Sequence, residues 1–476
     1  SPSLQYYVPN AYQGLVGRLT YEYASRYLAE FNMGYNGTEN FAKGKRFGFF
    51  PAVSLGWVIS EEKFFPKNNI VKYLKVRGSY GEVGNDQIGG DRFLYLPSSY
   101  GAASDSGVNK YNFGLASNPY TSLMIVENKI GNPDLTWEKA KKMNVGVDIN
   151  LFNNCLTASF DIFKEKRNNI LANRSTSPMI IGANLPAYNF GEMENRGWEM
   201  DLNFRHHIQD FHYWARFNYS FARNEIIYMD EVQKRYDYQM TTGRRKNQFF
   251  GLIFDGYYNS WEEINALDRP KSSWSGNQLQ PGDVKYVDVN RDGVIDDYDM
   301  VPIGYTPVPE IIYGFSFGAQ YKGFDFSILF QGADNVSIKY FGRSMWPFAK
   351  GEERAKSLIK ERWTQERYEA GEKITFPRLS LNPNGETDHN YRPSTLWIRD
   401  ASYLRLKNLE VGYTFTGGFV KRLNLNSVRL YFNGSNLFTW TDVVDLDPEA
   451  PSRSGNVEIN TYPLQKVYNI GLNINF

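Results

Sequence analysis

The chain has 476 residues, and its 53 Lys and Arg against 52 Asp and Glu leave a formal net charge of +1. This balance predicts no nucleic-acid partner and no polybasic membrane-binding surface, and a single cysteine, Cys155, excludes a fold stapled by disulfides. A mean hydropathy of −0.51 argues against a membrane-spanning helix, whereas an aromatic content of 16% is typical of the girdles of a membrane β-barrel or of a stacking surface.

Apolar and polar residues alternate in segments spread along the whole chain. Because successive side chains of a strand point to opposite faces, each such segment predicts a strand with one apolar and one polar face. The pattern predicts about thirteen strands of a transmembrane antiparallel β-barrel. The segments are residues 15–23, 29–35, 47–59, 74–80, 143–151, 156–162, 198–204, 213–221, 311–319, 324–330, 409–415, 428–432 and 468–476.

The last of these segments shows the alternation most clearly. Its apolar set is Tyr468, Ile470, Leu472, Ile474 and Phe476, and the residues between them are Asn469, Gly471, Asn473 and Asn475. Taken alone, this strand fits a half-buried sheet of a soluble protein as well as a barrel strand that faces lipid.

The lengths of the connections favour the barrel. If Phe476 lies on the periplasmic side, the periplasmic turns are short and fall at residues 24–25, 60–69, 153–155, 206–210, 321–323 and 417–426. The alternate connections are then extracellular loops; one, at 35–46, is modest, and the rest are longer, at 85–136, 167–189, 225–308, 332–397 and 441–465. Outer-membrane barrels have this asymmetry, and a soluble sandwich has no reason for it.

Thirteen strands that run from an extracellular loop to the periplasm cannot close as an antiparallel barrel. Two sheet edges with unpaired backbone groups would face lipid, at a cost of several kcal/mol per group. We therefore expect residues 1–476 to form the carboxy-terminal part of a larger barrel. No signal peptide is recognisable before the first predicted strand, although an outer-membrane protein needs one for export.

Several stretches of the chain resemble the SusC/RagA family of TonB-dependent transporters of the Bacteroidetes outer membrane. The resemblance covers most of the chain and implies a plugged barrel of about 22 strands. The family's signal peptide, TonB-binding segment, plug and first strands have no counterpart in these residues. The stretches that carry the resemblance are residues 46–59 (RFGFFPAVSLGWVI), 131–147, 283–299, 309–332, 400–415, 433–448 and 462–476.

The resemblance also implies a function in the bacterial outer membrane, with lipid around the barrel. Such a transporter imports oligosaccharides, or peptides in some members, under a SusD-like surface lipoprotein that acts as a lid. The TonB complex acts through the amino-terminal part that is missing here. A siderophore or cofactor receptor, a non-transporting surface adhesin or receptor and an outer-membrane hydrolase stay open as alternatives. We expect no enzyme, because the sequence has no Gly-x-Ser-x-Gly elbow, His-Glu-x-x-His pair or phosphate-binding glycine loop.

One motif carries the spacing of a calcium-binding loop. Residues 288–299 place oxygen ligands at loop positions 1, 3, 5, 7, 9 and 12, with Gly293 at the sharp turn. The sequence therefore predicts a structural Ca²⁺ in an extracellular loop. Position 12 is aspartate in place of glutamate, and its shorter side chain is less suited to bind the ion through both carboxylate oxygens. The alternative is an Asx and Gly turn whose backbone amides donate hydrogen bonds to its own carboxylates. The candidate ligands are Asp288, Asn290, Asp292, Val294 through its carbonyl, Asp296 and Asp299.

Two polar clusters are weaker candidates for a binding site. His206, His207 and His212 fall in a predicted periplasmic turn, and no cysteine or carboxylate completes a zinc site in the sequence, so we expect no metal there. A basic run, residues 244–246, comprises Arg244, Arg245 and Lys246 in a predicted extracellular loop. A solvated patch is the simple interpretation, and a contact with cargo or lid is the alternative.

Two further features concern the loops. Residues 352–371 place Ala355, Leu358, Ile359 and Trp363 at helical spacing, which predicts a short loop helix that packs one face, or else contacts the lid. Aromatic loop residues are candidates for stacking on sugar rings, although girdle or loop-core packing explains each of them as well. They are Tyr95, Tyr100, Tyr111, Trp261, Trp274 and Trp346.

Overall fold

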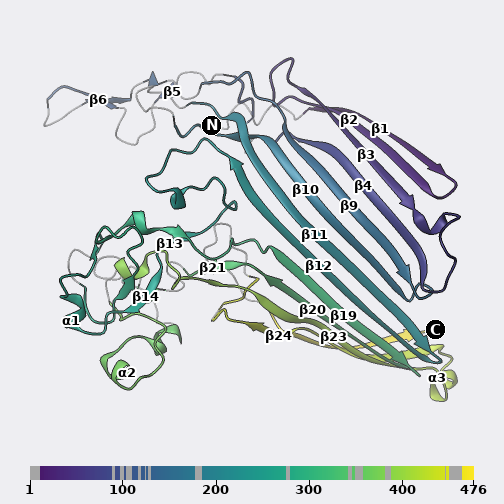
Figure 1. Cartoon of the computed structure of the whole chain (residues 1–476). Helices are drawn as coiled ribbons and strands as arrows, with labels where there is room; N and C mark the ends of the chain where they lie inside the picture. The colour runs from purple at the N-terminus through teal and green to yellow at the C-terminus, as the bar shows by residue number, and fades with distance from the viewer. Residues whose placement is uncertain are drawn as a thin grey trace.

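The computed structural model contains a large antiparallel sheet flanked at one end by folded loops (Figure 1). Within the described residues this sheet has 13 strands, in the order β1-β2-β3-β4-β9-β10-β11-β12-β19-β20-β23-β24-β25. Neighbours in the sheet are therefore neighbours in sequence, as the alternation predicted. The described residues are 11–87, 92–96, 101–102, 110–115, 120–123, 125–126, 130–176, 185–274, 279–340, 346–348, 357–380, 388–444, 446–449 and 464–476.

The strands coincide with the predicted segments, apart from Ile59, which begins a 3₁₀ turn, and Phe476, which follows the last strand. Each outer strand, β1 and β25, has one partner among the described strands. The expectation that further strands complete the barrel stays a prediction. The strands are β1 (Tyr12–Tyr23), β2 (Tyr27–Thr38), β3 (Phe47–Val58), β4 (Val71–Asn85), β9 (Glu138–Leu151), β10 (Leu156–Ala172), β11 (Tyr188–Ile208), β12 (Phe211–Tyr228), β19 (Ile311–Tyr321), β20 (Phe324–Asp334), β23 (Tyr403–Phe415), β24 (Ser427–Thr441) and β25 (Val467–Asn475).

The register places apolar side chains in continuous rows on one face of the sheet. One row joins Tyr23, Tyr27, Trp57, Val76, Val147, Phe160, Met200, Tyr219 and Tyr313, each directly opposite the next. The exposed fraction of such residues is high, 62% for Leu55 and 81% for Ile470. An apolar surface of this extent faces lipid rather than water. On β9 it runs from Met143 to Leu151, which spans about 20 Å of bilayer for a tilted strand.

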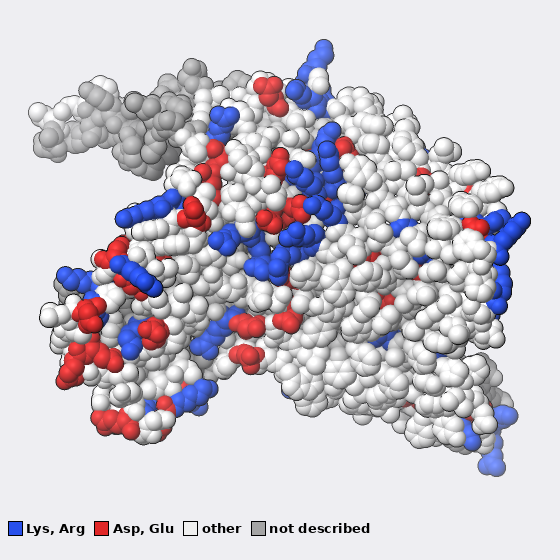
Figure 2. Space-filling model, viewed as in Figure 1, with Lys and Arg blue, Asp and Glu red and all other residues white. Residues whose placement is uncertain are grey.

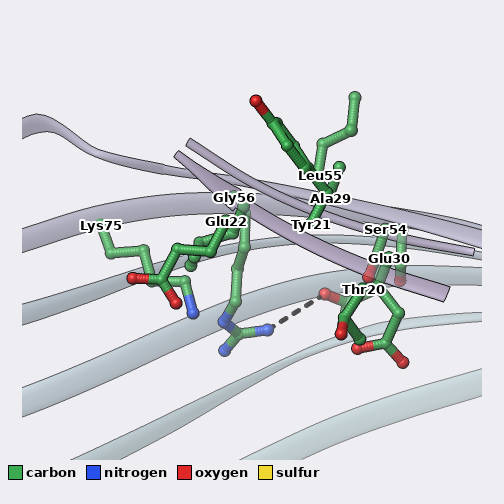
Figure 3. A pocket seen from close by; sticks show the side chains of 14 residues that line it. Thr20, Tyr21, Glu22, Ala29, Glu30, Ser54, Leu55, Gly56 and Lys75 are labelled. Carbon is green, nitrogen blue, oxygen red and sulfur yellow. Dashed lines mark hydrogen bonds between the residues drawn. The ribbon is translucent and has the colours of Figure 1, made fainter. Parts of the chain in front are cut away.

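The opposite face of the sheet is polar. Figure 3 shows both faces near β1 to β4: the side chains of Tyr21 and Leu55 lie on one side of the strands, and those of Glu22, Glu30 and Lys75 lie on the other. A polar row joins Lys75, Asp148, Ser159, Asp201, Asn218 and Gly314 across six strands. This face is the inner, lumen-facing one.

The predicted alternation of short turns and long loops is confirmed. One end of the sheet carries the short connections, including helix α3 (Phe419–Arg422) and the 3₁₀ turn η2 (Ile59–Glu61), and the chain's C-terminus lies at the same end (Figure 1). The long connections, with their small elements, all leave the other end. Among the described residues, none of the helices combines the length and the apolar character that crossing a bilayer requires.

The predicted loop 167–189 is partly wrong, because β10 and β11 continue into it as far as Ala172 and from Tyr188. The strand segments that lead into this loop, residues 164–167 and 192–196, carry charged residues where the alternation would place apolar ones. Cross-strand ion pairs stabilise them instead: Lys164 lies 2.9 Å from Glu194, and Lys166 lies 2.9 Å from Glu192. The predicted starts of two other loops, at residues 225 and 332, likewise fall inside β12 and β20.

Small elements fill the three long connections with described structure. Between β4 and β9 lie β5 (Gly101–Ala102), β6 (Lys110–Phe113), β7 (Tyr120–Leu123) and β8 (Ile125–Val126). Between β12 and β19 lie η4 (Asp237–Gln239), β13 (Phe250–Gly251), β14 (Phe254–Tyr257), α1 (Trp261–Ile264), β15 (Lys271–Ser272), β16 (Val284–Tyr286), β17 (Val294–Ile295), η5 (Asp297–Asp299) and β18 (Val301–Pro302). Between β20 and β23 lie β21 (Ser337–Lys339), η8 (Ser357–Glu361), α2 (Gln365–Glu369), η9 (Asp388–Tyr391) and β22 (Ile398–Asp400).

The largest buried core of the described residues lies in these loops rather than on the sheet. It draws residues from the β12–β19 connection, from the β20–β23 connection and, through Val443, from the chain after β24. Two separate loops thus share one core, which we call the loop unit. Its buried members are Leu252, Tyr257, Val284, Tyr286, Ile295, Val336, Ile338, Tyr340, Trp363, Phe376, Tyr391, Leu396, Trp397, Ala401 and Val443.

Candidate functional site

A network of charged side chains lies on the polar face across β4, β9 and β10. The Arg77 guanidinium donates from Nη1 and Nη2 to the two oxygens of Asp161, at 2.6 Å each, and from Nε to Asp148 Oδ2 at 3.1 Å. The Ser159 hydroxyl donates to Asp148 Oδ1 at 2.9 Å. Gly146 lies in register between Arg77 and Asp161. Its missing side chain leaves the space in which the two charged groups meet.

The same arrangement recurs on the polar face of β20, β23 and β24. Arg429 donates from Nε to Asp325 Oδ1 at 3.0 Å and from Nη2 to Glu410 Oε1 at 2.6 Å. Gly412 of β23 lies beneath the pair, and an added Cβ would meet Arg429 Nη2 and Asp325 Oδ2 at 2.7 Å each. The inner face therefore carries charges that are fixed in position, and in each of these two clusters one guanidinium faces two carboxylates.

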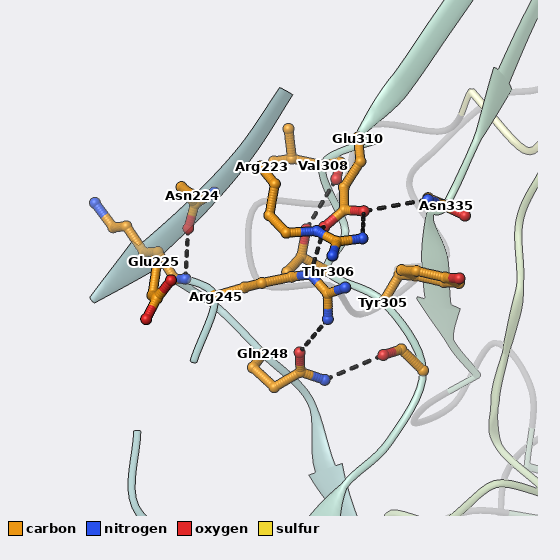
Figure 4. A network of polar contacts seen from close by, with 12 residues as sticks. Arg223, Asn224, Glu225, Arg245, Gln248, Tyr305, Thr306, Val308, Glu310 and Asn335 are labelled. Carbon is orange, nitrogen blue, oxygen red and sulfur yellow. Dashed lines mark hydrogen bonds and ion pairs between the residues drawn. The ribbon is translucent and has the colours of Figure 1, made fainter. Parts of the chain in front are cut away.

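A third cluster surrounds Glu310, at the root of the β12–β19 loop (Figure 4). Arg223 donates to both carboxylate oxygens at 3.0 and 2.8 Å, Arg245 Nε donates to Oε1, and Asn335 donates to Oε2 at 3.2 Å. The Glu310 side chain is only 4% exposed. Burial favours a higher pKa, but the hydrogen bonds from Arg223 and Arg245 outweigh it and hold the pKa of Glu310 below its ordinary value.

A fourth, buried polar cluster joins the two halves of the loop unit. Asp283 Oδ1 accepts from Arg378 Nε at 2.6 Å and from Asn390 Nδ2 at 2.8 Å, and Asn390 Oδ1 accepts from the Val284 amide at 2.8 Å. Asp283 and Val284 belong to one loop, and Arg378 and Asn390 belong to the other. The contacts thus fix the two loops to each other.

His389 strengthens the same junction in its neutral form. Its Nε2 lies 2.7 Å from the Val284 carbonyl, which can only accept, so Nε2 carries the proton and Nδ1 accepts from the Ser272 hydroxyl at 2.7 Å. Burial lowers the pKa of His389, because water is excluded from the charged form. The histidine is therefore a structural link between loops at neutral pH.

The candidate calcium loop, residues 288–299, has a regular internal hydrogen-bond pattern. Asp288 accepts from the amides of Arg291 and Gly293 at 2.7 and 2.8 Å, and Asn290 and Asp292 each accept from the amide two residues on, at 2.9 Å. Gly293 has φ +82°, as the sharp turn predicted. These contacts match the alternative interpretation, a turn satisfied by its own side chains.

The later ligands of this loop are engaged in the same way. Asp296 Oδ1 accepts from the Tyr298 amide at 2.7 Å. Asp299, which is fully buried, accepts from the amides of Val289 and Asp296 at 2.8 and 2.9 Å. Among the described residues, no three His, Cys, Asp or Glu side chains come together as a metal site would need. The donor types suit Ca²⁺, but the oxygens serve backbone amides and do not converge on one point.

The histidines do not lie in the turn as expected. His206 and His207 belong to β11 and His212 belongs to β12, because the strands continue to Ile208 and resume at Phe211. His207 pairs with His212, with ring centroids 5.6 Å apart, whereas His206 Nδ1 lies 3.4 Å from Cys155 Sγ. No pattern in the amino-acid sequence indicates this cysteine contact, which joins residues 51 positions apart.

The predicted helix over 352–371 is wrong in its described part. Two short helices, η8 and α2, flank an extended stretch in which the Trp363 amide donates to the Phe376 carbonyl at 2.7 Å. The apolar spacing does mark core residues, because Trp363 is buried in the loop unit and Ile359 packs against it. Residues 352–356, and with them Ala355, lie outside the described residues.

The aromatic candidates separate into packed and exposed ones. Trp274 and Trp346 pack against the core of the loop unit, and Trp274 also lies under the Arg392 guanidinium at 4.6 Å. Trp261 is 54% exposed at the start of α1. Tyr95 contacts Phe93 edge-on. Tyr100 lies outside the described residues, and Tyr111 is part of β6.

The residues of the basic run, 244–246, also differ in their surroundings. Arg245 is part of the Glu310 cluster, so it is not simply a solvated residue. Arg244 and Lys246 line hollows beside that cluster, and backbone hydrogen bonds hold this segment against the end of β12: Gly243 donates to Ile226 O at 2.7 Å, and Ile226 donates to Arg244 O at 2.8 Å.

Comparisons with known proteins agree with this architecture. Residues 3–437 match the family model described as "TonB dependent receptor-like, beta-barrel". TonB-dependent receptor P3 of Formosa agariphila is 28% identical over 97% of this chain and 45% of its own length. TonB-dependent receptor SusC of Bacteroides thetaiotaomicron is 28% identical over 99% of this chain and 44% of its own.

Among solved structures, that of the RagAB peptide importer in the open-open state matches with a TM-score of 0.74 and 22% identity, over 98% of this chain and 47% of that one. The chain thus spans a little under half the length of the relatives it matches. The chain belongs to the family of TonB-dependent receptor-like β-barrels, and it lies in the bacterial outer membrane as part of a multi-pass barrel.

Proposed function

We propose that the protein imports oligosaccharides or peptides across the outer membrane, driven by the TonB complex and assisted by a SusD-like surface lipoprotein. The names of two relatives support this proposal, since one is SusC and another is a peptide importer. The pairing of the inner-face charges supports it as well. Carboxylates that are held in place around Arg77 and Arg429 can accept hydrogen bonds from the donors of hydroxyl-rich or amide-rich cargo.

One observation carries the proposal: the long loops fold into a single unit at the end of the barrel opposite the short turns. Loops that only connected strands would not bury Tyr340, Trp397 and Phe376, which are 1%, 2% and 1% exposed. A preformed surface lowers the entropy that a partner or a cargo must lose on docking. A lipoprotein lid that opens and closes over the mouth of the barrel requires such a rigid binding surface, which we call the rigid seat.

Uptake by intact cells tests this function. Cells with and without the protein would receive a mixture of oligosaccharides, a mixture of peptides and a set of ferric chelates. The proposal expects depletion of one of the first two mixtures, abolished by an uncoupler of the proton-motive force and by deletion of the lipoprotein. Depletion of ferric chelates alone would identify a siderophore receptor, and no depletion of any mixture would favour an adhesin.

We further propose, from ligand spacing, that residues 288–299 bind a structural Ca²⁺. A carboxylate has about four acceptor positions, so these side chains keep capacity for an ion beside their backbone hydrogen bonds. The side chains of Asp288, Asn290 and Asp292 would have to turn toward a common point. We therefore expect weak binding, with a Kd of about 10⁻⁴–10⁻³ M, as in extracellular calcium modules.

A further inference from the structure

The charged ends of β10, β11 and β12 lie directly above the apolar surface of the barrel. The last apolar row on the lipid-facing side joins Val145, Ile162, Trp198, Phe221 and Ile311 in register. Two residues farther toward the loops, the same face carries Lys164, Arg196 and Arg223, each directly opposite the next. The two rows are about 7 Å apart along the strands. The cations therefore occupy the level at which acyl chains give way to lipid headgroups.

Three cations in adjacent register positions repel one another unless anions compensate them. Lys164 pairs with Glu194 at 2.9 Å, and Arg223 pairs with Glu310 at 2.8 Å. Arg196, between them, has only distant partners, Glu194 at 4.0 Å and Glu225 at 3.9 Å, and its side chain is 62% exposed. The central position of the row is thus the least neutralised.

The basic run adds further cations at the same place. A hollow of about 320 Å³ lies between the strand ends and the loop, and its lining includes Arg196, Arg223, Arg244 and Arg245 with Glu225. Figure 2 shows Lys and Arg side chains, with Asp and Glu among them, gathered at the margin of a broad surface with few charges. The cations therefore form one patch beside the lipid-facing surface rather than a scatter over the loops.

The charge of the hollow fits a phosphate group. Arg223 and Arg245 share one carboxylate, that of Glu310, and Arg196 approaches Glu225. Within the described part of the chain, Arg244 makes no ion pair, so four guanidinium groups and Lys164 face three carboxylates, those of Glu194, Glu225 and Glu310. A phosphate monoester carries a charge of about −1.5 to −2 at pH 7, and the planar guanidinium matches its oxygens in pairs.

We propose that this hollow binds the phosphorylated headgroup of an outer-leaflet lipid. The apolar row through Ile162, Trp198 and Phe221 then lies beside the acyl chains of the same lipid. The register excludes a contact with cargo in the lumen, because Arg196 and Arg223 lie on the lipid-facing side of their strands. A free phosphate ion would use the cations but not the adjacent apolar row.

Lipid binding to the purified full-length protein tests the proposal. The probes are a bis-phosphorylated lipid A and the same lipid with its phosphates removed, both in one detergent, with bound lipid counted by native mass spectrometry. The variant is R196Q/R244Q, because both side chains are accessible. Arg223 and Arg245 stay unchanged, since removing either would leave Glu310 buried with too little compensation. The matched control is K421Q/R422Q, which removes two exposed cations from α3 at the short-turn end.

We expect the phosphorylated lipid to bind at least about tenfold more tightly than its dephosphorylated form. R196Q/R244Q should lose most of that preference, whereas K421Q/R422Q should keep it. Heat-modifiable migration on gels confirms that each variant has a folded barrel. Equal binding of the two lipids, or an unchanged preference in R196Q/R244Q, would overturn the proposal.

Two further measurements distinguish the lipid from other ligands of the hollow. An excess of inorganic phosphate should displace the lipid only weakly, because it lacks the apolar contacts, and complete displacement would indicate a site for the free ion instead. Co-purification of the surface lipoprotein should be the same for R196Q/R244Q and the wild type. Loss of the lipoprotein with unchanged lipid binding would show that the patch contacts a protein partner, which also contradicts the proposal.

Discussion

Arg77 of β4 and Asp161 of β10 join through two hydrogen bonds of 2.6 Å across the strand that separates them. The intervening residue of β9 is Gly146. An ion pair between strands that are not neighbours requires a gap in the side chains of the middle strand, and a glycine supplies it. The pair ties three strands together on the lumen side, where backbone hydrogen bonds already join them pairwise.

The substitution G146A should therefore destabilise the barrel. A Cβ there would lie 2.6 Å from Asp161 Oδ1 and 2.7 Å from Arg77 Nη1, so the pair would have to separate. We expect a loss of about 1–3 kcal/mol in the free energy of unfolding, the usual range for overpacking, measured by chemical unfolding in lipid vesicles. G78A is the matched control, because its Cβ would meet nothing nearer than Asn144 O at 3.8 Å. Equal stability of the two variants would contradict this account.

The alternation in the sequence predicted the two faces of the sheet but not such pairs. The alternation places Arg77 and Asp161 on the polar face, yet 84 residues separate them in the sequence. A single sequence does not show which residues of distant strands lie opposite each other. The length of β11 was missed for a different reason. Only residues 198–204 alternate, whereas the strand runs over Tyr188–Ile208, because its loop-side half carries Glu192, Glu194 and Arg196 on the face that is apolar farther along the strand.

E310Q should destabilise the junction between barrel and loops in a pH-dependent way. The neutral amide keeps the shape of the side chain but leaves Arg223 and Arg245 without their shared anion, at a cost of about 2–3 kcal/mol near pH 7. The pKa of Glu310 is lowered in the folded protein, so its contribution is complete above the ordinary value of about 4.3 and is lost as pH falls through the folded pKa.

Thermal unfolding of wild type and E310Q at pH 7 and at about pH 3 measures this difference. The difference in midpoint temperature of unfolding between the two proteins should be large at neutral pH and should disappear in acid. E372Q serves as a control, since Glu372 pairs with Arg367 at 2.6 Å but is 51% exposed, and such pairs are worth about 0.5 kcal/mol. A gap that is independent of pH would refute an ionised Glu310.

N390A should loosen both long loops at once. Asn390 is fully buried, and its loss leaves the Val284 amide without an acceptor and removes one donor from Asp283. We expect a cost of about 2–4 kcal/mol to the loop unit, without loss of the barrel. Limited proteolysis with mass spectrometry should find new cuts in the β12–β19 and β20–β23 connections together.

The exposed Tyr368 of α2 offers a control, Y368A, which should leave the cleavage pattern unchanged. New cuts in N390A that were confined to the β20–β23 connection would show that the two loops fold separately. That outcome would also remove the main structural support for a rigid seat at the mouth of the barrel.

Residues 288–299 should gain protease resistance from calcium if they hold the ion. Digestion of the full-length protein with added Ca²⁺ and with chelator would be compared, and D288N/D292N, which removes two ligand charges, should abolish the difference. Asp268→Asn is a control, because Asp268 lies in the same connection outside the motif. Identical digestion with calcium and chelator would show that the backbone hydrogen bonds of Asp288 and Asp299 suffice to shape the loop.

The loop unit was the least predictable part of the molecule. The spacing of Ile359 and Trp363 indicated a helix, whereas the chain turns between them so that Trp363 enters a core shared with Tyr257 and Val284 of another loop. Trp274 and Trp346 likewise pack against this core, a contact that the sequence did not indicate. The spacing of apolar residues indicates only local helices and strands. Contacts between two long connections produce no regular spacing, so the sequence does not indicate them.

The central claim, import with a surface lipoprotein, is tested most directly by mass spectrometry of the protein purified gently from native outer membrane. The account predicts a stoichiometric SusD-like lipoprotein and a bound oligosaccharide or peptide, which would also identify the class of cargo. A protein that carried neither a lipoprotein partner nor either class of ligand would contradict the account and favour an adhesive or structural role.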